Sequence, residues 1–107
     1  MNQKDSEAIE EFRIGVRRLL GNNLERLAIF GSKAEGRDTW DSDIDILVLI
    51  KDSAVNLYER ILDLAFEVNL KHDVYVSPRV ITTSTYNHPV WKITPFMQQL
   101  RQKAIVL

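Results

Sequence analysis

The stretch Ile44-Asp45-Ile46-Leu47-Val48-Leu49-Ile50 is the feature that most constrains the fold. Side chains alternate between the two faces of a β-strand, and both faces are apolar here after the opening carboxylates. A strand of this kind is covered on both sides, so we expect it in the middle of a sheet. At 107 residues the chain is large enough for one core, and we assign 1–107 to a single domain.

The segment before this strand has the layout of a nucleotide-binding site. A β-type run over 27–30 leads into Gly31-Ser32, and a short polar helix is expected to follow. Glycine lets the backbone approach a phosphate closely, and the N–H groups that open a helix attract anions. Gly31 and Ser32 are therefore candidate phosphate-binding residues.

Two carboxylates, Asp43 and Asp45, open the apolar strand. Side chains two apart share a face of a strand, with about 6.5–7 Å of backbone between them. Two carboxylates can converge from there on metal ions, which lie about 3.5–4 Å apart in paired sites. Because the like charges repel without a cation, the spacing predicts Mg²⁺.

Three other interpretations fit this stretch less well. The glycine spacing matches a P-loop, but Arg37-Asp38 replaces the Lys-Ser/Thr pair which that loop requires. The alternating aspartates imitate a calcium-binding EF-hand, but Ile46 stands where that loop needs glycine. A simple hairpin with an acidic turn requires neither the Gly-Ser pair nor its spacing.

The pattern Gly-Ser, ten intervening residues and Asp-x-Asp resembles the signature of the polymerase-beta-like nucleotidyltransferase superfamily. The continuation over 42–48 resembles in particular the minimal nucleotidyltransferases (MNT) of bacteria and archaea. This resemblance implies an α/β (α+β) palm, a small mixed sheet with helices packed mainly on one face. The family often reads Gly-Ser-Arg-Ala-Arg-Gly, whereas Lys33 and Glu35 occupy the arginine places here. Whether Lys33 or Arg37 binds phosphate stays open.

The resemblance also implies a reaction, the Mg²⁺-dependent transfer of AMP from ATP to an acceptor hydroxyl. Asp43 and Asp45 are then metal ligands beside the triphosphate. The superfamily carries a third acidic residue on a later strand, and Asp73 stands where that pattern predicts one. Its implied role is to hold a metal and to take the proton of the attacking hydroxyl, with Glu67 as the reserve candidate.

The resemblance further implies a protein partner. Minimal nucleotidyltransferases are often paired with HEPN-domain toxins, so the acceptor is expected to be a tyrosine of a cognate HEPN toxin. The chain is then the antitoxin of a type VII toxin–antitoxin pair. One alternative is an antitoxin that acts by protein binding alone. Another is a small-molecule nucleotidyltransferase of the aminoglycoside-modifying kind.

The composition limits which other partners and which location we expect. The net charge of −1 gives no reason to expect constitutive nucleic-acid binding. The chain has no cysteine and no long apolar run, so we expect neither disulfides nor a membrane segment. We therefore expect a cytoplasmic location. A homo-oligomer is left open.

The other expected elements follow from periodicity and capping residues. Helices are expected from Asp5 or Ser6 through Leu20, after Ser53, and from Thr94-Pro95 through Lys103. A third strand is expected over 72–76, ended by Ser77-Pro78. The β-prone stretch 80–85 is expected to be an edge strand or an extended connection.

Overall fold

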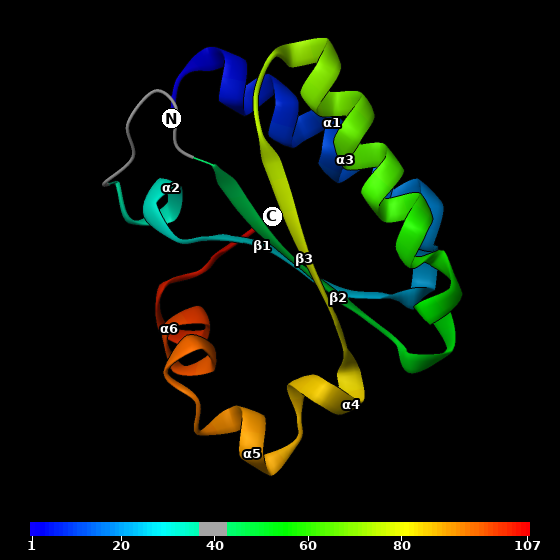
Figure 1. The fold of residues 1–107 in the computed structure, drawn as a ribbon, viewed down its shortest axis with the longest axis vertical. Helices are drawn as coiled ribbons and strands as arrows, with labels where there is room; N and C mark the ends of the chain where they lie inside the picture. The colour runs from blue at the N-terminus through cyan, green and yellow to red at the C-terminus, as the bar shows by residue number, and fades with distance from the viewer. Residues whose placement is uncertain (37–42) are drawn as a thin grey trace.

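A four-stranded sheet with strand order β3-β2-β1-β4 runs through the middle of the described chain (Figure 1). The computed structural model describes residues 1–36 and 43–107. Strand β1 pairs antiparallel with β2 and β4, and β2 pairs parallel with β3, so the sheet is mixed, as predicted. The strands are β1 (Leu24–Phe30), β2 (Ile44–Ile50), β3 (Val76–Thr82) and β4 (Ile105–Val106).

Strand β2 lies between β1 and β3, as its two apolar faces predict. Ile44, Ile46, Val48 and Ile50 are buried on one face in the larger hydrophobic core. Leu47 is buried on the other face, in a smaller core. The strand therefore carries the two carboxylates at one end of an otherwise enclosed segment.

Two long helices, α1 (Gln3–Leu20) and α3 (Tyr58–His72), lie side by side over one face of the sheet (Figure 1). The Asn2 side chain caps α1, which begins slightly earlier than predicted, and Gly21 ends it. Short 3₁₀ turns, Gly21–Asn23 and Asp52–Leu57, lead into β1 and α3. The core residues of the two helices are Ala8, Ile9, Phe12, Val16, Leu20, Ile61, Ala65 and Val68.

Helix α6 (Pro95–Lys103) covers part of the opposite face, capped by Thr94 as predicted. Its Met97 and Leu100 form the smaller core with Leu47 and its neighbour on β1. The helices are thus packed mainly on one face, in agreement with the expectation. The shorter helices are α2 (Ser32–Glu35), α4 (Thr83–Tyr86) and α5 (Pro89–Lys92). Within 1–36 and 43–107, no helix combines the length and apolarity needed to cross a bilayer.

The third strand differs from the prediction. The sequence placed it over 72–76, whereas α3 continues through His72 and β3 occupies Val76–Thr82. Proline cannot donate to a ladder, so the sequence predicts that the strand stops at Ser77-Pro78; at the edge of a sheet, however, proline is tolerated within a strand. The stretch 80–85 supplies the end of edge strand β3 through Thr82, as expected, and then turns into α4.

A side chain completes the outer edge of β3. The Val76 N–H donates to Oδ1 of Asn69 at 2.6 Å, and the Val76 carbonyl accepts from Nδ2 of the same side chain at 3.2 Å. Asn69 on α3 thereby takes the place of a neighbouring strand at this position.

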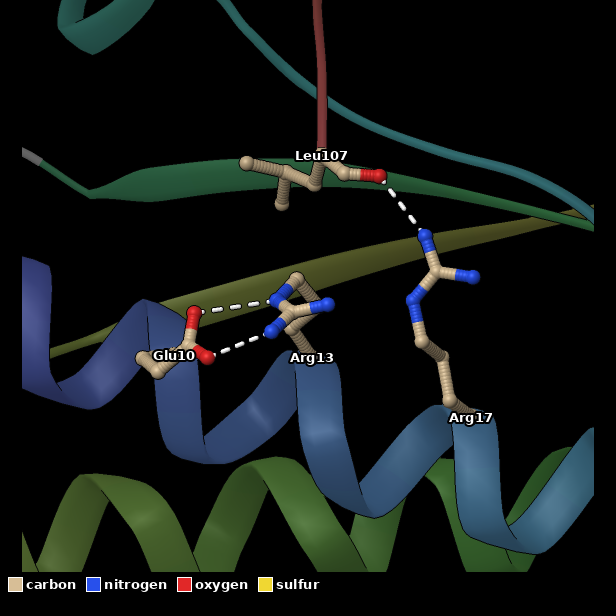
Figure 2. A network of polar contacts seen from close by, with 4 residues as sticks. All are labelled: Glu10, Arg13, Arg17 and Leu107. Atoms are coloured by element: carbon tan, nitrogen blue, oxygen red, sulfur yellow. Dashed lines mark hydrogen bonds and ion pairs between the residues drawn. The ribbon is translucent and has the colours of Figure 1, made fainter.

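The C-terminal residues join the sheet beside β1. The Leu107 N–H donates to the Leu27 carbonyl, and the Leu107 carbonyl accepts from Arg17 at 2.8 Å (Figure 2). One turn earlier on α1, Arg13 pairs with Glu10 (Figure 2). These two arginines therefore make contacts within the fold.

Candidate active site

The turn at Gly31 brings β1 against a carboxylate of β2. Gly31 has φ +77°, in the region that favours glycine. A Cβ at this position would lie only 2.7 Å from Oδ2 of Asp45, far inside contact distance. Glycine is therefore required here for both the backbone conformation and the approach of Asp45, and α2 starts at the next residue. Sequence reasoning predicted a tight glycine turn for phosphate, and it missed the approach of the carboxylate.

Asp43 and Asp45 lie on one face of the sheet, as predicted. Ile44 and Ile46 point into the core under α1 and α3, so the residues alternating with them face the other way. Asp43 is exposed just before β2, and Asp45 is half-buried within the strand. Partial burial, followed by the charge of Asp43, raises the pKa of Asp45 above its ordinary value, and the charge of Arg79 opposes this shift.

The edge strand adds residues to this face which the sequence prediction did not include. In the parallel ladder Ser77 lies opposite Asp45, and Arg79 lies opposite Leu47. Arg79 is exposed. The signal that could have identified these residues is the alternation over 76–82, which the supposed stop at Pro78 obscured.

Tyr75 occupies the position next to Asp43. The Ile44 N–H donates to the Tyr75 carbonyl at 2.8 Å, and Ile44 pairs with Val76, so the preceding residues are also neighbours. Val76 is buried in the larger core and Val74 packs against it. Tyr75, between them, faces the opposite side, which is the side of Asp43 and Asp45, and is 61% exposed.

A groove of about 550 Å³ continues this face along β3. The groove is lined by residues of β3 and of three helices: Tyr58, Pro78, Arg79, Val80, Ile81, Trp91 and Phe96. Phe96 also contacts Phe30 edge to face, at 5.7 Å between ring centroids, so it anchors α6. The carboxylate pair thus lies at one end of a surface that also carries a cation and aromatic rings.

Comparison with known proteins identifies this arrangement. The family model described as polymerase beta, nucleotidyltransferase matches residues 17–87, which contain the glycine turn and both carboxylates. A relative from Methanocaldococcus jannaschii, named a putative protein adenylyltransferase, is 34% identical over 73 residues, covering 67% of this chain and 74% of its own.

The chain belongs to the polymerase beta nucleotidyltransferase family. The prediction of a nucleotidyltransferase is therefore confirmed, and the observed sheet and helices are those of this fold. A structure described as a minimal nucleotidyltransferase superposes with a TM-score of 0.56 at 23% identity, covering 94% of each chain. A chain from a crystal structure of a toxin–antitoxin with AMP-PNP gives 0.57 at 22% identity, covering 91% of this chain and 70% of its own.

In this nucleotidyltransferase, Asp73 does not lie on a strand as predicted. It is the C-cap of α3, with φ +52°, because the helix extends further than the β-type sequence suggested. Its side chain is fully exposed, and Oδ2 lies 3.7 Å from Nζ of Lys4. The reserve candidate Glu67 lines a groove between α1 and α3, on the helical side of the sheet. The structure therefore brings neither residue onto the face of the carboxylate pair.

Lys33, at one of the family's arginine places, points into the protein. Its Nζ lies 2.8 Å from Oδ2 of Asp5, and the two side chains are only 1% and 5% exposed. This buried ion pair fastens the nucleotidyltransferase's α2 to the first turn of α1. Arg37, the other cation considered for phosphate, lies outside the described residues.

The described carboxylates fit part of a metal site. No group of three metal-binding side chains is found among residues 1–36 and 43–107. Asp43 and Asp45 nevertheless supply two oxygen-donor side chains on one face, the type of ligand that Mg²⁺ prefers. Burial and the charge of Asp43 raise the pKa of Asp45, and a bound cation would offset both effects.

Proposed function

We propose that the protein transfers AMP from ATP to a hydroxyl group of a protein, in the presence of Mg²⁺. The observation that carries the proposal is the carboxylate pair Asp43 and Asp45, of which Asp45 lies against the glycine turn that opens α2. The relative named as an adenylyltransferase of proteins supports the choice of donor and acceptor class.

The proposed roles follow from position. The backbone at Gly31 and Ser32 would bind the β- and γ-phosphates through N–H groups at the start of α2. Asp43 and Asp45 would hold Mg²⁺, which, when bound, neutralises charge on the triphosphate and orients the pyrophosphate leaving group. Arg79, on the same face, would add positive charge near the phosphates.

The acceptor is proposed to be a tyrosine of a HEPN-type toxin encoded alongside this protein. A structural neighbour comes from a toxin–antitoxin solved with AMP-PNP, which supports a partner of this kind. An added adenylyl group carries negative charge, so near a ribonuclease site it would repel the RNA backbone.

Calorimetry with Mg-ATP tests the site. The wild type is expected to bind Mg-ATP far better than ATP alone, and Asp43→Asn/Asp45→Asn should abolish that gain. Asp63→Asn, an exposed aspartate on α3, is the matched control and should behave as the wild type. Unchanged Mg-ATP affinity in the double variant would contradict the assignment.

The proposed role of Asp73 needs its own test, because its position does not support it. Loss of transfer in Asp73→Asn with nearly unchanged Mg-ATP affinity would be the signature of a group acting in the transition state. Unaltered transfer would assign Asp73 to the helix cap alone. Glu67→Gln, on the helical side, is expected to be close to neutral.

A second candidate function is neutralisation of the toxin by binding alone, and the surface of α3 favours it. Leu62, Phe66 and Leu70 recur every four residues and are 36%, 63% and 70% exposed. An exposed apolar stripe of this kind is typical of a protein interface. If the double variant neutralises the toxin and intact mass spectra never show AMP on it, binding alone is sufficient. Phe66→Asp should then release the toxin.

A further inference from the structure

We propose that Tyr75 of this protein is itself an acceptor of the nucleotidyl group, so that the enzyme modifies its own edge strand. The inference rests on the proposed function, since it requires the same nucleotide at the same carboxylates. It adds an acceptor within this chain, at a position which no comparison assigns.

A backbone hydrogen bond and the core contacts of its two neighbours determine where Tyr75 lies. Its carbonyl is bonded to the Ile44 N–H at 2.8 Å, and the core contacts of Val74 and Val76 direct the ring to the carboxylate face. Neighbouring strands are about 4.8 Å apart, so the phenol side chain starts one strand spacing from Asp43. Exposure of 61% leaves it free to move toward a nucleotide bound there.

The other tyrosines lie elsewhere. Tyr58 begins α3, beyond the end of β2 that is opposite to Asp43, and lines the groove along β3. Tyr86 packs against the smaller core and stacks on Arg101, whose Cζ lies 4.5 Å from the ring centroid. Among the tyrosines, Tyr75 alone lies beside the described carboxylate pair.

The chemical step balances with a nucleoside triphosphate as the co-reactant. The phenol oxygen of Tyr75 attacks the α-phosphorus, and a new phosphorus–oxygen bond forms. The bond from the α-phosphorus to the oxygen bridging toward the β-phosphorus breaks, so pyrophosphate leaves with that electron pair. The phenol proton passes to the water that surrounds the exposed ring. The product is a tyrosyl phosphodiester and pyrophosphate.

Proximity makes this transfer an intramolecular reaction. Reacting groups held on one scaffold have effective concentrations that no separate acceptor reaches in solution. Tyr75 offers a single phenol oxygen as the acceptor. We therefore expect at most one nucleotidyl group per chain.

Intact-mass spectrometry of the purified full chain with Mg-ATP is the first test. The wild type should gain one adenylyl group, and fragmentation should place it on Tyr75. Tyr75→Phe should gain none. Tyr86→Phe keeps its ring and its Arg101 contact, so it should react as the wild type. Modification that persists in Tyr75→Phe would overturn the proposal.

A mixing experiment tests whether the transfer occurs within one chain. Asp43→Asn/Asp45→Asn, which retains Tyr75, is incubated with Tyr75→Phe, which retains the carboxylates. Neither chain should gain mass if the reaction is intramolecular. Labelling of the double variant would show transfer between chains and overturn the intramolecular step.

Calorimetry separates failure of this inference from failure of the proposed function. Tyr75→Phe should keep the Mg-ATP affinity of the wild type, since the lost hydroxyl is the acceptor. If the wild type binds Mg-ATP through Asp43 and Asp45 and gains no mass, self-modification is wrong and the proposed function stands. If binding does not depend on these aspartates, both fall together.

Discussion

At the scale of single residues, Asp45 is a proposed metal ligand whose ionised form lowers the stability of the metal-free fold. Its pKa is raised by partial burial and by Asp43, so the folded protein favours the protonated carboxyl more than the unfolded chain does. Both states are protonated at low pH, and both are ionised well above the raised pKa. The metal-free fold therefore loses stability as pH rises through this interval.

Asp45→Asn should remove this pH dependence. In metal-free buffer, the melting temperature of the variant should increase relative to that of the wild type as pH rises from acidic to neutral. Addition of Mg-ATP should stabilise the wild type and leave the variant unchanged, because only the wild type binds it through this pair. A wild type that gains stability over the variant with rising pH, without metal, would contradict the argument.

The buried pair between Asp5 and Lys33 predicts a large effect on stability. Removal of one partner of a buried ion pair costs about 3–5 kcal/mol. Asp5→Ala should therefore lower the free energy of unfolding by about this amount, as measured in denaturant. The matched control is Glu10→Ala, which breaks the exposed contact with Arg13 (Figure 2) and should cost at most about 1 kcal/mol.

At the scale of elements, the turn between β1 and α2 determines how closely the site is assembled. Gly31→Ala would place a methyl group 2.7 Å from the Asp45 carboxylate and strain the backbone at φ +77°. The matched control is Gly21→Ala, where φ is +53° and nothing lies within 4 Å of the added Cβ.

Both glycine variants should lose about 1–3 kcal/mol from backbone strain. Gly31→Ala should lose more and should also weaken Mg-ATP binding, because Asp45 must move away. Denaturation together with calorimetry measures both effects. Equal losses of stability and unchanged affinity in the two variants would show that the close approach is unimportant.

Prediction from sequence was most successful where one strand or helix contains its own signal. Strand β2 is apolar on both faces, and α6 carries its cap and proline within two residues. The position of β3 depended on Pro78, whose effect differs between the edge and the middle of a sheet. That error also misplaced Asp73 and concealed Arg79.

In the candidate site, too, contacts between residues close in sequence could be predicted and contacts between distant residues could not. Asp43, Asp45 and Gly31 come together through an antiparallel pair whose strands flank one short segment, so local spacing predicted them. The ion pair of Lys33 with Asp5 joins residues 28 positions apart. No local pattern predicts such a contact, because it depends on how α1 packs against the start of α2.

At the scale of the whole molecule, the sheet separates two cores of unequal size. The smaller one depends on α6, whose Leu100 is 3% exposed against the face that also bears the carboxylates. Leu100→Ala should cost about 2–5 kcal/mol, since it leaves a cavity under the sheet. Ile105→Ala is the control, because Ile105 is 48% exposed and should lose much less. Chemical denaturation gives both values, and similar losses would show that α6 packs only loosely.

The pairing of Asn69 with Val76 has a consequence for the protein at high concentration. An unprotected edge strand is a template on which further chains can add, and this is how many proteins form fibrils. Along the outer edge of β3, the N–H and the carbonyl of Val76 are already hydrogen-bonded to the side chain of Asn69. Pro78, two residues later, has no N–H that could donate to another strand. The opposite edge is β4, which is only 2 residues long. Lateral growth of the sheet is therefore hindered at the start of β3 and finds only a short template along β4. Assembly of copies through the helices or the carboxylate face is favoured over assembly through the sheet edges.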